Sequence, residues 1–418
     1  MAAGGLSHAM LAAIAMPPSR LHPVEFIALM AMIFATVAFS VDAMLPAMPE
    51  IAATLSPEAP NLAQLVVTAF VLGMGLGTFV TGPLSDSYGR KPVILAGAGL
   101  YIVGAALAWA APTIELLLAA RLVQGLGAAG PRVVTLAIIR DLYSGERMAR
   151  TMSFVLMVFA VVPALAPLLG AGIIAVAGWR EIFAAFIAFA AVSSLWMLLR
   201  LRETLPRDRR LPFRRESFAR ALSEIAGNPR VRLAILVQGL CFGMLFTMLS
   251  TVQQVYDLTF GRADSFPYWF AAIAVVAAGA NLANAAAVMR LGMRRLITGA
   301  LAAQVVLSGA MILLGLFPPA EPVFFGAFVI WQASILVQTA LTLGNVNALA
   351  MEPLGHIAGV ASSVIGAVAT VVAVTLAVPT GLLFDGTPLP IAAGIFVMAS
   401  VALGLMVRIR TLEARMCA

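Results

Sequence analysis

The chain has 418 residues, of which 62% are hydrophobic and only 11% are charged, and its mean hydropathy is +1.01. A soluble domain carries about 25% charged residues, so this composition excludes a soluble fold and predicts a polytopic membrane protein. The formal net charge of +7 comes almost entirely from arginines that flank apolar segments, which membrane topology explains without a nucleic-acid partner.

Successive apolar runs of about 20 residues have the length that a helix needs to cross a bilayer. We therefore predict an all-α polytopic membrane protein with twelve transmembrane helices in two six-helix bundles. The first bundle is expected at residues 24–199, after a tail at residues 1–23, and the second at residues 231–408, before a tail at residues 409–418. The spans of the first bundle are predicted near Val24–Pro46, Asn61–Gly82, Pro92–Ala111, Thr113–Ala137, Thr151–Ala177 and Glu181–Leu199.

Residues 200–230, between the two bundles, are the only long polar segment and are predicted to be a basic linker. The stretch Arg200–Arg232 contains ten arginines. Within it Phe218, Leu222 and Ile225 recur at helical spacing, which predicts a short helix along the membrane surface. The spans of the second bundle are predicted near Val231–Gln254, Phe266–Val288, Arg294–Leu316, Val323–Ala350, Ile357–Leu383 and Leu389–Val407.

The positive residues predict how the chain is oriented, because lysine and arginine beside a span stay on the cytoplasmic side. With these spans, all but four of the 26 positive residues fall on one side of the membrane. Arg180 and Arg262 fall on the other side, while Arg121 and Arg132 lie within spans. This bias predicts that both termini and the linker are cytoplasmic. It also supports an even number of spans, because an odd number would divide the positive residues between the two sides of the membrane.

The stretch Gly82–Pro92, with the sequence GPLSDSYGRKP, separates the second and third predicted spans. We expect Gly82 and Pro83 to end the second span, because glycine has no side chain and proline cannot continue the helical hydrogen bonds. Arg90 and Lys91 precede the third span, which makes the stretch a cytoplasmic hairpin loop. Met289–Arg295 repeats its positive residues and one glycine in the second half, but lacks the aspartate.

Two charged residues lie within predicted spans, where a charge costs about 2.5–3.5 kcal/mol and tends to be functional. Asp42 is in the first span and Arg121 is in the fourth, at similar depth toward the outer side, so an ion pair between them is possible. The alternative for Asp42 is a hydrated carboxylate near the outer surface. For Arg132 we favour a side chain that extends to the inner headgroups over a second charge in the cavity.

Polar residues also recur at helical spacing within two spans of the second half. The seventh span contains Gln238 and Phe242 on one face, and the tenth contains Gln338, Thr342 and Asn345. Because polar atoms in lipid need partners, these faces are expected to border a cavity or another helix. The predicted substrate cavity comprises Phe39, Gln124, Gln238, Phe242, Gln338, Thr342 and Asn345.

The sequence offers no pattern typical of an enzyme. The three histidines are scattered, so no metal site is predicted, and no G-x-S-x-G motif is present. A phosphate-binding loop of the Walker A type needs Gly-Lys-Ser/Thr, but the only lysine, Lys91, lies between arginine and proline. We therefore expect no enzymatic activity, no cofactor and no ATPase.

Several stretches together resemble the major facilitator superfamily, in its Bcr/CflA branch of drug:proton antiporters. Gly82–Pro92 is similar to that superfamily's loop G-x-x-x-D-x-x-G-R-[RK] between its second and third helices. The other stretches that carry the resemblance are Asp42–Pro49, Ala120–Ala129, Ile139–Tyr143, Pro163–Pro167, Gly178–Phe183 and Ala350–Gly359.

The resemblance implies a proton-coupled exporter of small organic compounds or drugs in the bacterial inner membrane, working by alternating access as a monomer. A proton-coupled importer of a small metabolite on the same fold is the alternative. Asp42 would then be the proton-responsive carboxylate, with Arg121 as its cationic partner. A cytoplasmic latch, which would hold the outward-facing state, is implied at Gly82, Asp86, Gly89, Arg90, Lys91 and Asp141.

Overall fold

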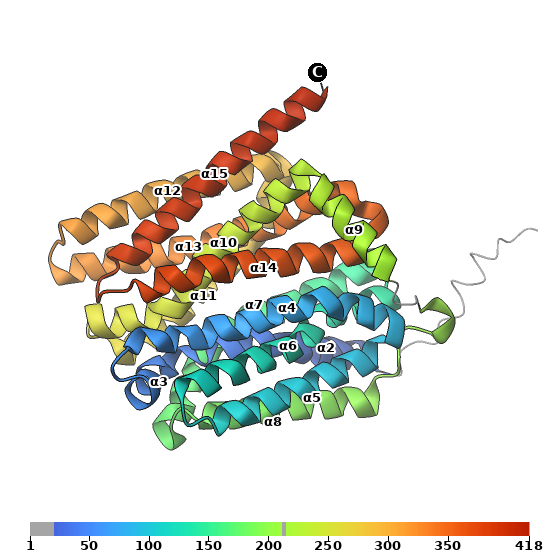
Figure 1. Cartoon of the computed structure of the whole chain (residues 1–418), viewed down its shortest axis with the longest axis horizontal. Coiled ribbons are helices and arrows are strands. Elements are labelled where there is room, and N and C mark those ends of the chain that lie inside the picture. The colour runs from blue at the N-terminus through green and yellow to red at the C-terminus, as the bar shows by residue number, and fades with distance from the viewer. Residues whose placement is uncertain (1–20, 211–214, 418) are drawn as a thin grey trace, which may run out of the picture.

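The computed structural model describes residues 21–210 and 215–417, and over these residues the chain consists of helices and short connections. Figure 1 shows the N-terminal half lying beside the C-terminal half, with most helices running along the long axis of the molecule. The helices of the N-terminal half are α2 (Pro23–Asp42), α3 (Met48–Leu55), α4 (Leu65–Tyr88), α5 (Arg90–Trp109), α6 (Ile114–Leu142), α7 (Gly145–Ala177) and α8 (Glu181–Arg200).

The C-terminal half repeats this plan after a linker that contains the 3₁₀ turn Arg207–Arg209 and the helix α9 (Arg215–Gly227). Short 3₁₀ turns also flank α3, at Leu45–Ala47 and Pro60–Gln64. The helices of the C-terminal half are α10 (Pro229–Gln254), α11 (Phe266–Leu291), α12 (Met293–Leu316), α13 (Glu321–Met351), α14 (Ala358–Leu382) and α15 (Leu389–Cys417).

Within the described residues, eleven helical stretches are long and apolar enough to cross a membrane. One of them, Glu321–Leu382, has 62 residues. At about 1.5 Å per residue it would be about 90 Å long, three times the thickness of the hydrocarbon core. It consists of α13 and α14, joined by the 3₁₀ turn Glu352–Ile357 in which Leu354 leaves helical geometry. The prediction of twelve spans in two sets of six is thereby confirmed.

The two halves approach most closely where glycines remove side chains. A Cβ atom at Gly75 of α4 would lie 2.9 Å from the Thr370 side chain of α14, and one at Gly82 would collide with Ser363. Within the C-terminal half, Gly239 of α10 packs in the same way against Val372 of α14. Such contacts let helices approach closely in lipid, where packing replaces the hydrophobic effect as the driving force. The helix α14 therefore lies directly against the N-terminal half.

The prediction that Gly82 and Pro83 end the second span is wrong, because α4 continues through Pro83 to Tyr88. Hydroxyl groups bond the carbonyl oxygens around the proline: Ser85 to Gly82 at 2.8 Å and Ser87 to Pro83 at 3.0 Å. Proline is tolerated within membrane helices, where neighbouring helices and local adjustments of the backbone compensate for the missing N–H. The connection to α5 is the single residue Gly89, whose φ of +105° suits glycine.

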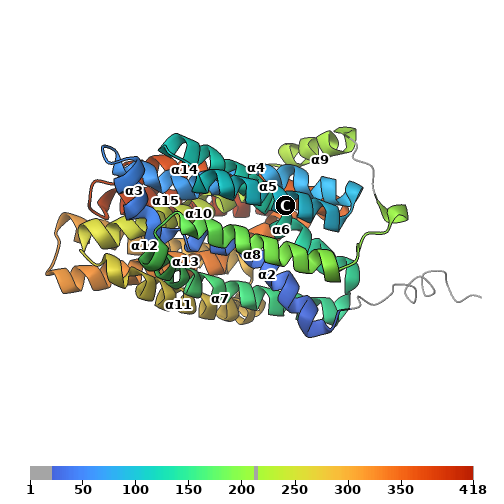
Figure 2. The ribbon, with the colours of Figure 1, turned by 90° about the horizontal axis from the view of Figure 1, so that it is seen from below.

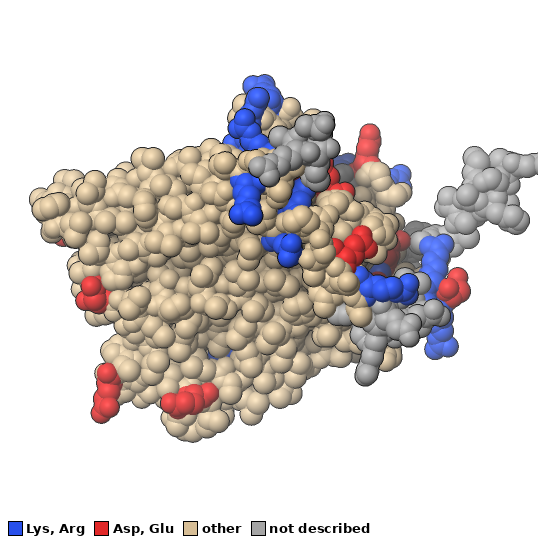
Figure 3. Space-filling view, turned by 45° about the horizontal axis from the view of Figure 1, so that its top comes forward, with Lys and Arg blue, Asp and Glu red and all other residues tan. Residues whose placement is uncertain are grey.

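The predicted linker helix is present as α9, which packs against α10 and α14. Ile225 is buried in this contact, while Leu222 is 42% exposed. The side chain of Phe218 lies outside the described residues. Figure 2 shows α9 at the edge of the bundle, toward one end of the molecule. In Figure 3 basic side chains gather toward this same end.

Candidate transport site

Arg90 is the centre of the latch predicted from the sequence. Its guanidinium donates to Asp86 Oδ1 at 2.5 Å, to Ser85 Oγ at 2.8 Å and to Asp141 Oδ2 at 2.9 Å. The backbone places these groups together, since Asp86 is one turn before Arg90 and Asp141 ends the neighbouring α6. Hydrogen bonds in which one partner is ionised are shorter and stronger than those between neutral groups. One buried arginine therefore bridges two carboxylates.

Glu203 is a latch residue that the sequence analysis missed. Its carboxylate accepts hydrogen bonds from the backbone N–H groups of Arg90 at 2.9 Å and Lys91 at 3.1 Å. These are orphan donors at the positive N-terminal end of α5, where a carboxylate is stabilising. Lys91 in turn donates to the carbonyl oxygens of Leu198 and Leu201 at 2.8 and 2.7 Å. The start of the linker is thus bound to the latch.

The latch ion pairs all lie within the N-terminal half. Asp86 is on α4, Arg90 on α5 and Asp141 on α6, so the three residues move together when the two halves move. The latch approaches α14 at two points: Gly82 packs against Ser363, and Asp86 Oδ2 lies 3.9 Å from the position of a Cβ on Gly359. The predicted proximity of Asp86 to Arg90, Asp141 and the start of α14 is confirmed.

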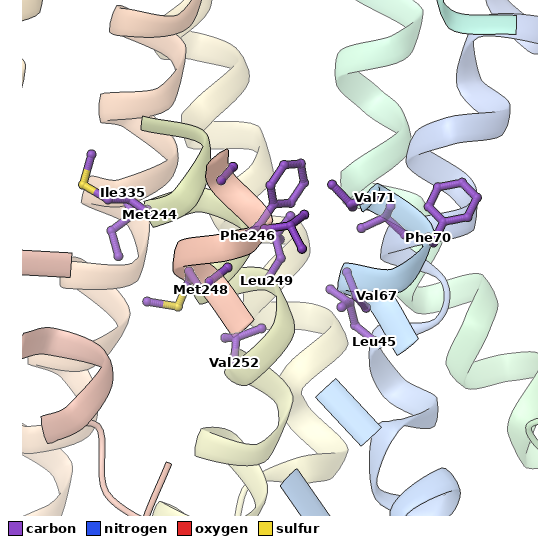
Figure 4. Packing of buried hydrophobic residues seen from close by; sticks show 14 of the residues in the cluster. Leu45, Val67, Phe70, Val71, Met244, Phe246, Met248, Leu249, Val252 and Ile335 are labelled. Carbon is purple, nitrogen blue, oxygen red and sulfur yellow. The ribbon is translucent and has the colours of Figure 1, made fainter. Parts of the chain in front are cut away.

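The end of the molecule opposite the latch is closed by apolar side chains of both halves (Figure 4). Leu45, Val67 and Val71 of the N-terminal half face α10 of the C-terminal half across this layer. Polar contacts also cross it: Gln64 bonds Gln254, and Asn61 donates to the Phe384 carbonyl at 2.7 Å. The α10 residues labelled in the layer are Met244, Phe246, Met248, Leu249 and Val252.

The assembled latch thus coexists with a closed opposite end. The implied role of the latch, to hold the outward-facing state, stays a prediction. Arg90, Asp86 and Asp141 all belong to the N-terminal half, so their ion pairs do not themselves join the two halves. Only the contact of the latch with α14 can change when the halves move.

A cavity of about 450 Å³ lies between the two halves at the latch end; we call it the inter-half cavity. Its size falls within the range of ligand pockets. Helices α2, α4, α5 and α6 of one half and α10, α13 and α14 of the other contribute to it. Its lining includes Phe34, Thr78, Asp86, Arg90, Arg132, Arg140, Asp141, Gln238, Phe242, Leu343, Gly344, Asn347, Gly359, Ser362 and Ser363.

Of the seven predicted cavity residues, Gln238 and Phe242 line this cavity. Gln338 and Thr342 bond each other at 2.8 Å beside Cys241, and Asn345 bonds Asn284 of α11 at 2.9 Å. The prediction that Gln338 and Asn345 share a space with Asp42 and Gln238 is therefore wrong for this conformation. The polar face of α13 is directed at α10 and α11.

The remaining two predicted cavity residues pack within the N-terminal half. The ring of Phe39 lies 5.3 Å from that of Phe186 and 5.2 Å from that of Phe189. Gln124 is fully buried and accepts a hydrogen bond from Arg121 at 2.7 Å. Neither residue borders the inter-half cavity.

Asp42 and Arg121 do not form an ion pair. Arg121 is fully buried and donates to the carbonyl oxygens of Val66 at 3.1 Å and Ser40 at 3.0 Å, as well as to Gln124. Its guanidinium lies 4.4 Å from the centroid of the Phe70 ring. Asp42 is only 5% exposed, and no described residue forms an ion pair with it. The structure thus leaves a buried carboxylate without a cation.

Arg132 lines the inter-half cavity. The expectation that its side chain extends to the headgroups is therefore wrong. The residue lies on the same helix as Arg121 but about 15 Å from the end of α6 at Leu142, at about 1.5 Å per residue. A side chain directed into a cavity between the halves can be hydrated there without reaching the membrane surface.

The C-terminal half contains a counterpart of the latch. Gly292, with a φ of +79°, connects α11 to α12 just as Gly89 connects α4 to α5. The aspartate missing from this loop is replaced by carboxylates of other helices: Arg294 bonds Glu413 at 2.7 Å, and Arg230 bonds both Glu413 and Glu352. The internal repeat seen in the sequence is therefore also a repeat of charge pairing. No group of possible metal ligands occurs in the described ranges.

Thiol labelling can test the orientation of α13. In a background without Cys241 and Cys417, Asn347→Cys should react with a small polar thiol reagent, because Asn347 lines the inter-half cavity. Gln338→Cys should react far more slowly, because Gln338 is 2% exposed and packed beside α10. Labelling in membranes is measured as the loss of the gel shift that a maleimide-linked polyethylene glycol afterwards produces at unreacted cysteines of the denatured protein. Faster reaction at residue 338 than at residue 347 would contradict this orientation of α13.

Comparisons with known proteins agree with the geometry. The sequence profile of the Major Facilitator Superfamily matches residues 29–378. The bicyclomycin resistance protein homologue of Haemophilus influenzae is 32% identical over 340 residues, which cover 79% of this chain and 82% of the relative. Multidrug resistance protein MdtL of Escherichia coli is 28% identical, with 78% of this chain and 80% of the relative covered.

Solved structures show the same fold. The xylose transporter XylE of E. coli, in a partially occluded inward open conformation, superposes with a TM-score of 0.73. The match covers 92% of this chain and 97% of the transporter at 13% sequence identity. Membership in this family makes the protein a membrane transporter and not an enzyme. The chain belongs to the major facilitator superfamily, in the branch of the bicyclomycin resistance proteins.

Proposed function

We propose that this transporter exports small organic compounds, including drugs, by exchange for protons. The observation that carries the proposal is the inter-half cavity, which lies at the latch end while the opposite end is closed by both halves. A carrier that works by alternating access needs such a cavity between two halves that can move against each other. The drug-resistance relatives support export as the direction.

Asp42 supports the coupling to protons. Placing an acidic residue inside a membrane protein costs free energy, and such residues typically lie on a proton or substrate pathway. Asp42 is buried, has no cationic partner and lies beside the closed layer at Leu45. A movement of the halves that opens this layer would hydrate the carboxylate, and hydration changes its proton affinity. The same movement that exposes the substrate would therefore load or release a proton.

The distribution of positive residues supports an orientation with the latch end in the cytoplasm. The latch, the linker and the residues around Gly292 hold most of the arginines, and such residues stay on the cytoplasmic side. We propose residues 1–23 and 409–418 as cytoplasmic tails and residues 200–230 as a cytoplasmic linker between the bundles 24–199 and 231–408. The membrane would be the bacterial inner membrane, and the working unit a monomer.

Transport in inside-out membrane vesicles tests the proposal. When respiration acidifies the vesicle interior, vesicles that contain the protein should accumulate at least one compound from a set of anionic, neutral and cationic fluorescent drugs above control vesicles, and an uncoupler should abolish the difference. A panel of antibiotics extends the search for substrates. Uptake driven by a proton gradient in right-side-out vesicles would instead support the alternative, import of a metabolite. Accumulation that persists with the uncoupler would contradict proton coupling.

A further inference from the structure

Arg132 is a cation inside the inter-half cavity without a carboxylate partner. Its guanidinium contacts the Met74 sulfur at 3.7 Å, a weak acceptor. No Asp or Glu among the described residues forms an ion pair with it. An unpaired charge at this depth is expensive, and intramembrane charges mark substrate pathways. The guanidinium therefore has hydrogen-bonding capacity that the folded protein leaves unused.

The other charges of the cavity do not compensate Arg132. Asp86 and Asp141 are both bonded to Arg90, which shares its guanidinium between them. Arg140 adds a further exposed cation near the latch. The lining thus carries three arginines against two aspartates, and both aspartates are already paired. A ligand in this space meets a positive field, which attracts anions.

Polar and aromatic groups also face the same cavity from both halves. Gln238 of α10 is 5% exposed, and its Oε1 atom is buried without a hydrogen-bond partner. Asn347 of α13 also lines the cavity. Phe34 and Phe242 provide apolar surface on opposite sides, from α2 and α10. Such a set of few polar groups within apolar walls is typical of a site for a small organic molecule.

We infer that the substrates of this site are organic anions, with a carboxylate or a similar planar anionic group on an apolar or aromatic body. The guanidinium of Arg132 matches a carboxylate with two parallel hydrogen bonds. Gln238 donates to or accepts from the polar part of the substrate, while Phe34 and Phe242 contact its apolar body. This inference rests on the proposed function, because it assigns the substrate class of the same cavity.

Three ligands of equal size can show whether binding depends on the charge of the ligand or on its shape. The probes are 2-naphthoate, the neutral 2-naphthamide and the cationic 2-naphthylmethylamine, and their binding to the purified full chain in detergent is measured by calorimetry at pH 7. The naphthoate should bind at least about tenfold more tightly than the amine. Arg132→Gln should weaken the naphthoate at least about tenfold, the usual scale for one lost charge-assisted pair, and leave the amide unchanged.

Two further variants serve as controls. Arg132→Lys keeps the charge and should retain most of the affinity for naphthoate. Arg262→Gln removes one positive charge from an exposed ion pair with Glu321 outside the cavity, and should leave naphthoate binding unchanged. Should Arg132→Gln fail to fold, the comparison of the three ligands on the wild-type protein still decides the question.

Naphthoate that binds no more tightly than the amine would overturn the inference, as would an unchanged affinity in a folded Arg132→Gln variant. This failure differs from a failure of the proposed function. Proton-driven accumulation of a cationic drug without naphthoate binding would refute the anion class and keep the exporter. Arg132-dependent naphthoate binding without any energised transport would keep the anion site and refute the exporter.

Discussion

Arg90→Gln should lower the rate of transport at least about tenfold while the protein still inserts into the membrane. The substitution removes the guanidinium that Asp86, Asp141 and Ser85 share. Each hydrogen bond to a charged group contributes about 1.5–3 kcal/mol, and the change leaves two carboxylates without a counter-charge. The three helices α4, α5 and α6 then lose the contact that makes the latch end of this half rigid. Initial rates in vesicles, normalised to the amount of protein, measure the effect.

Asp86→Asn provides a milder test of the same site. It keeps the Arg90–Asp141 pair but removes the anion that approaches Gly359 at the start of α14. We expect reduced transport with normal insertion. Arg295→Gln is the matched control, because Arg295 is an exposed arginine at the corresponding connection of the other half. Wild-type rates for both Arg90→Gln and Asp86→Asn would remove the latch from the mechanism.

The fold could be predicted because the thickness of the bilayer sets the length of each apolar segment that crosses it. Runs of about 20 apolar residues gave the correct number of spans even where α13 and α14 are nearly continuous. Helix ends were less predictable. Pro83 indicated an end in the sequence, but α4 passes through it and continues to Tyr88. A rule derived from helices in water underestimates what membrane helices tolerate.

The latch was predictable because its chemistry lies mostly in one short stretch. Asp86 and Arg90 are one helical turn apart, so their pairing follows from local structure. Glu203 was not predictable in this way, because 113 residues separate it from Arg90 in the chain. Its only signal was an acidic residue in a basic linker, directly after the sixth span.

The cavity was the least predictable part. A polar stripe such as Gln338, Thr342 and Asn345 shows that a helix face avoids lipid, but it does not say which neighbour that face meets. In α13 the stripe packs against α10 and α11, while Asn347 borders the cavity. Arg132 was misplaced for the same reason. The rotation of each helix about its own axis depends on how all its neighbours pack. The periodicity of one segment carries no information about that packing.

Asp42→Asn should abolish proton-driven accumulation of substrate and leave the fold intact. Asparagine is close in size to aspartate and resembles its protonated form. Because Asp42 has no ion pair in this conformation, the substitution leaves no cation unpaired. Arg121 keeps its bonds to Val66, Ser40 and Gln124. The expected loss is therefore specific to energy coupling, and it is measured as accumulation of drug in energised inside-out vesicles.

The energetics explain why one carboxylate is sufficient. One charge that crosses a potential of 100 mV releases about 2.3 kcal/mol, which supports a substrate gradient of roughly fiftyfold. A transporter with a permanently neutral residue 42 cannot collect this energy, yet its two halves can still exchange substrate passively. Asp42→Asn should thus retain exchange of labelled for unlabelled substrate without a proton gradient. Efflux from this variant with the pH dependence of the wild type would rule out Asp42 as the coupling residue, because a neutral amide carries no proton between the two sides.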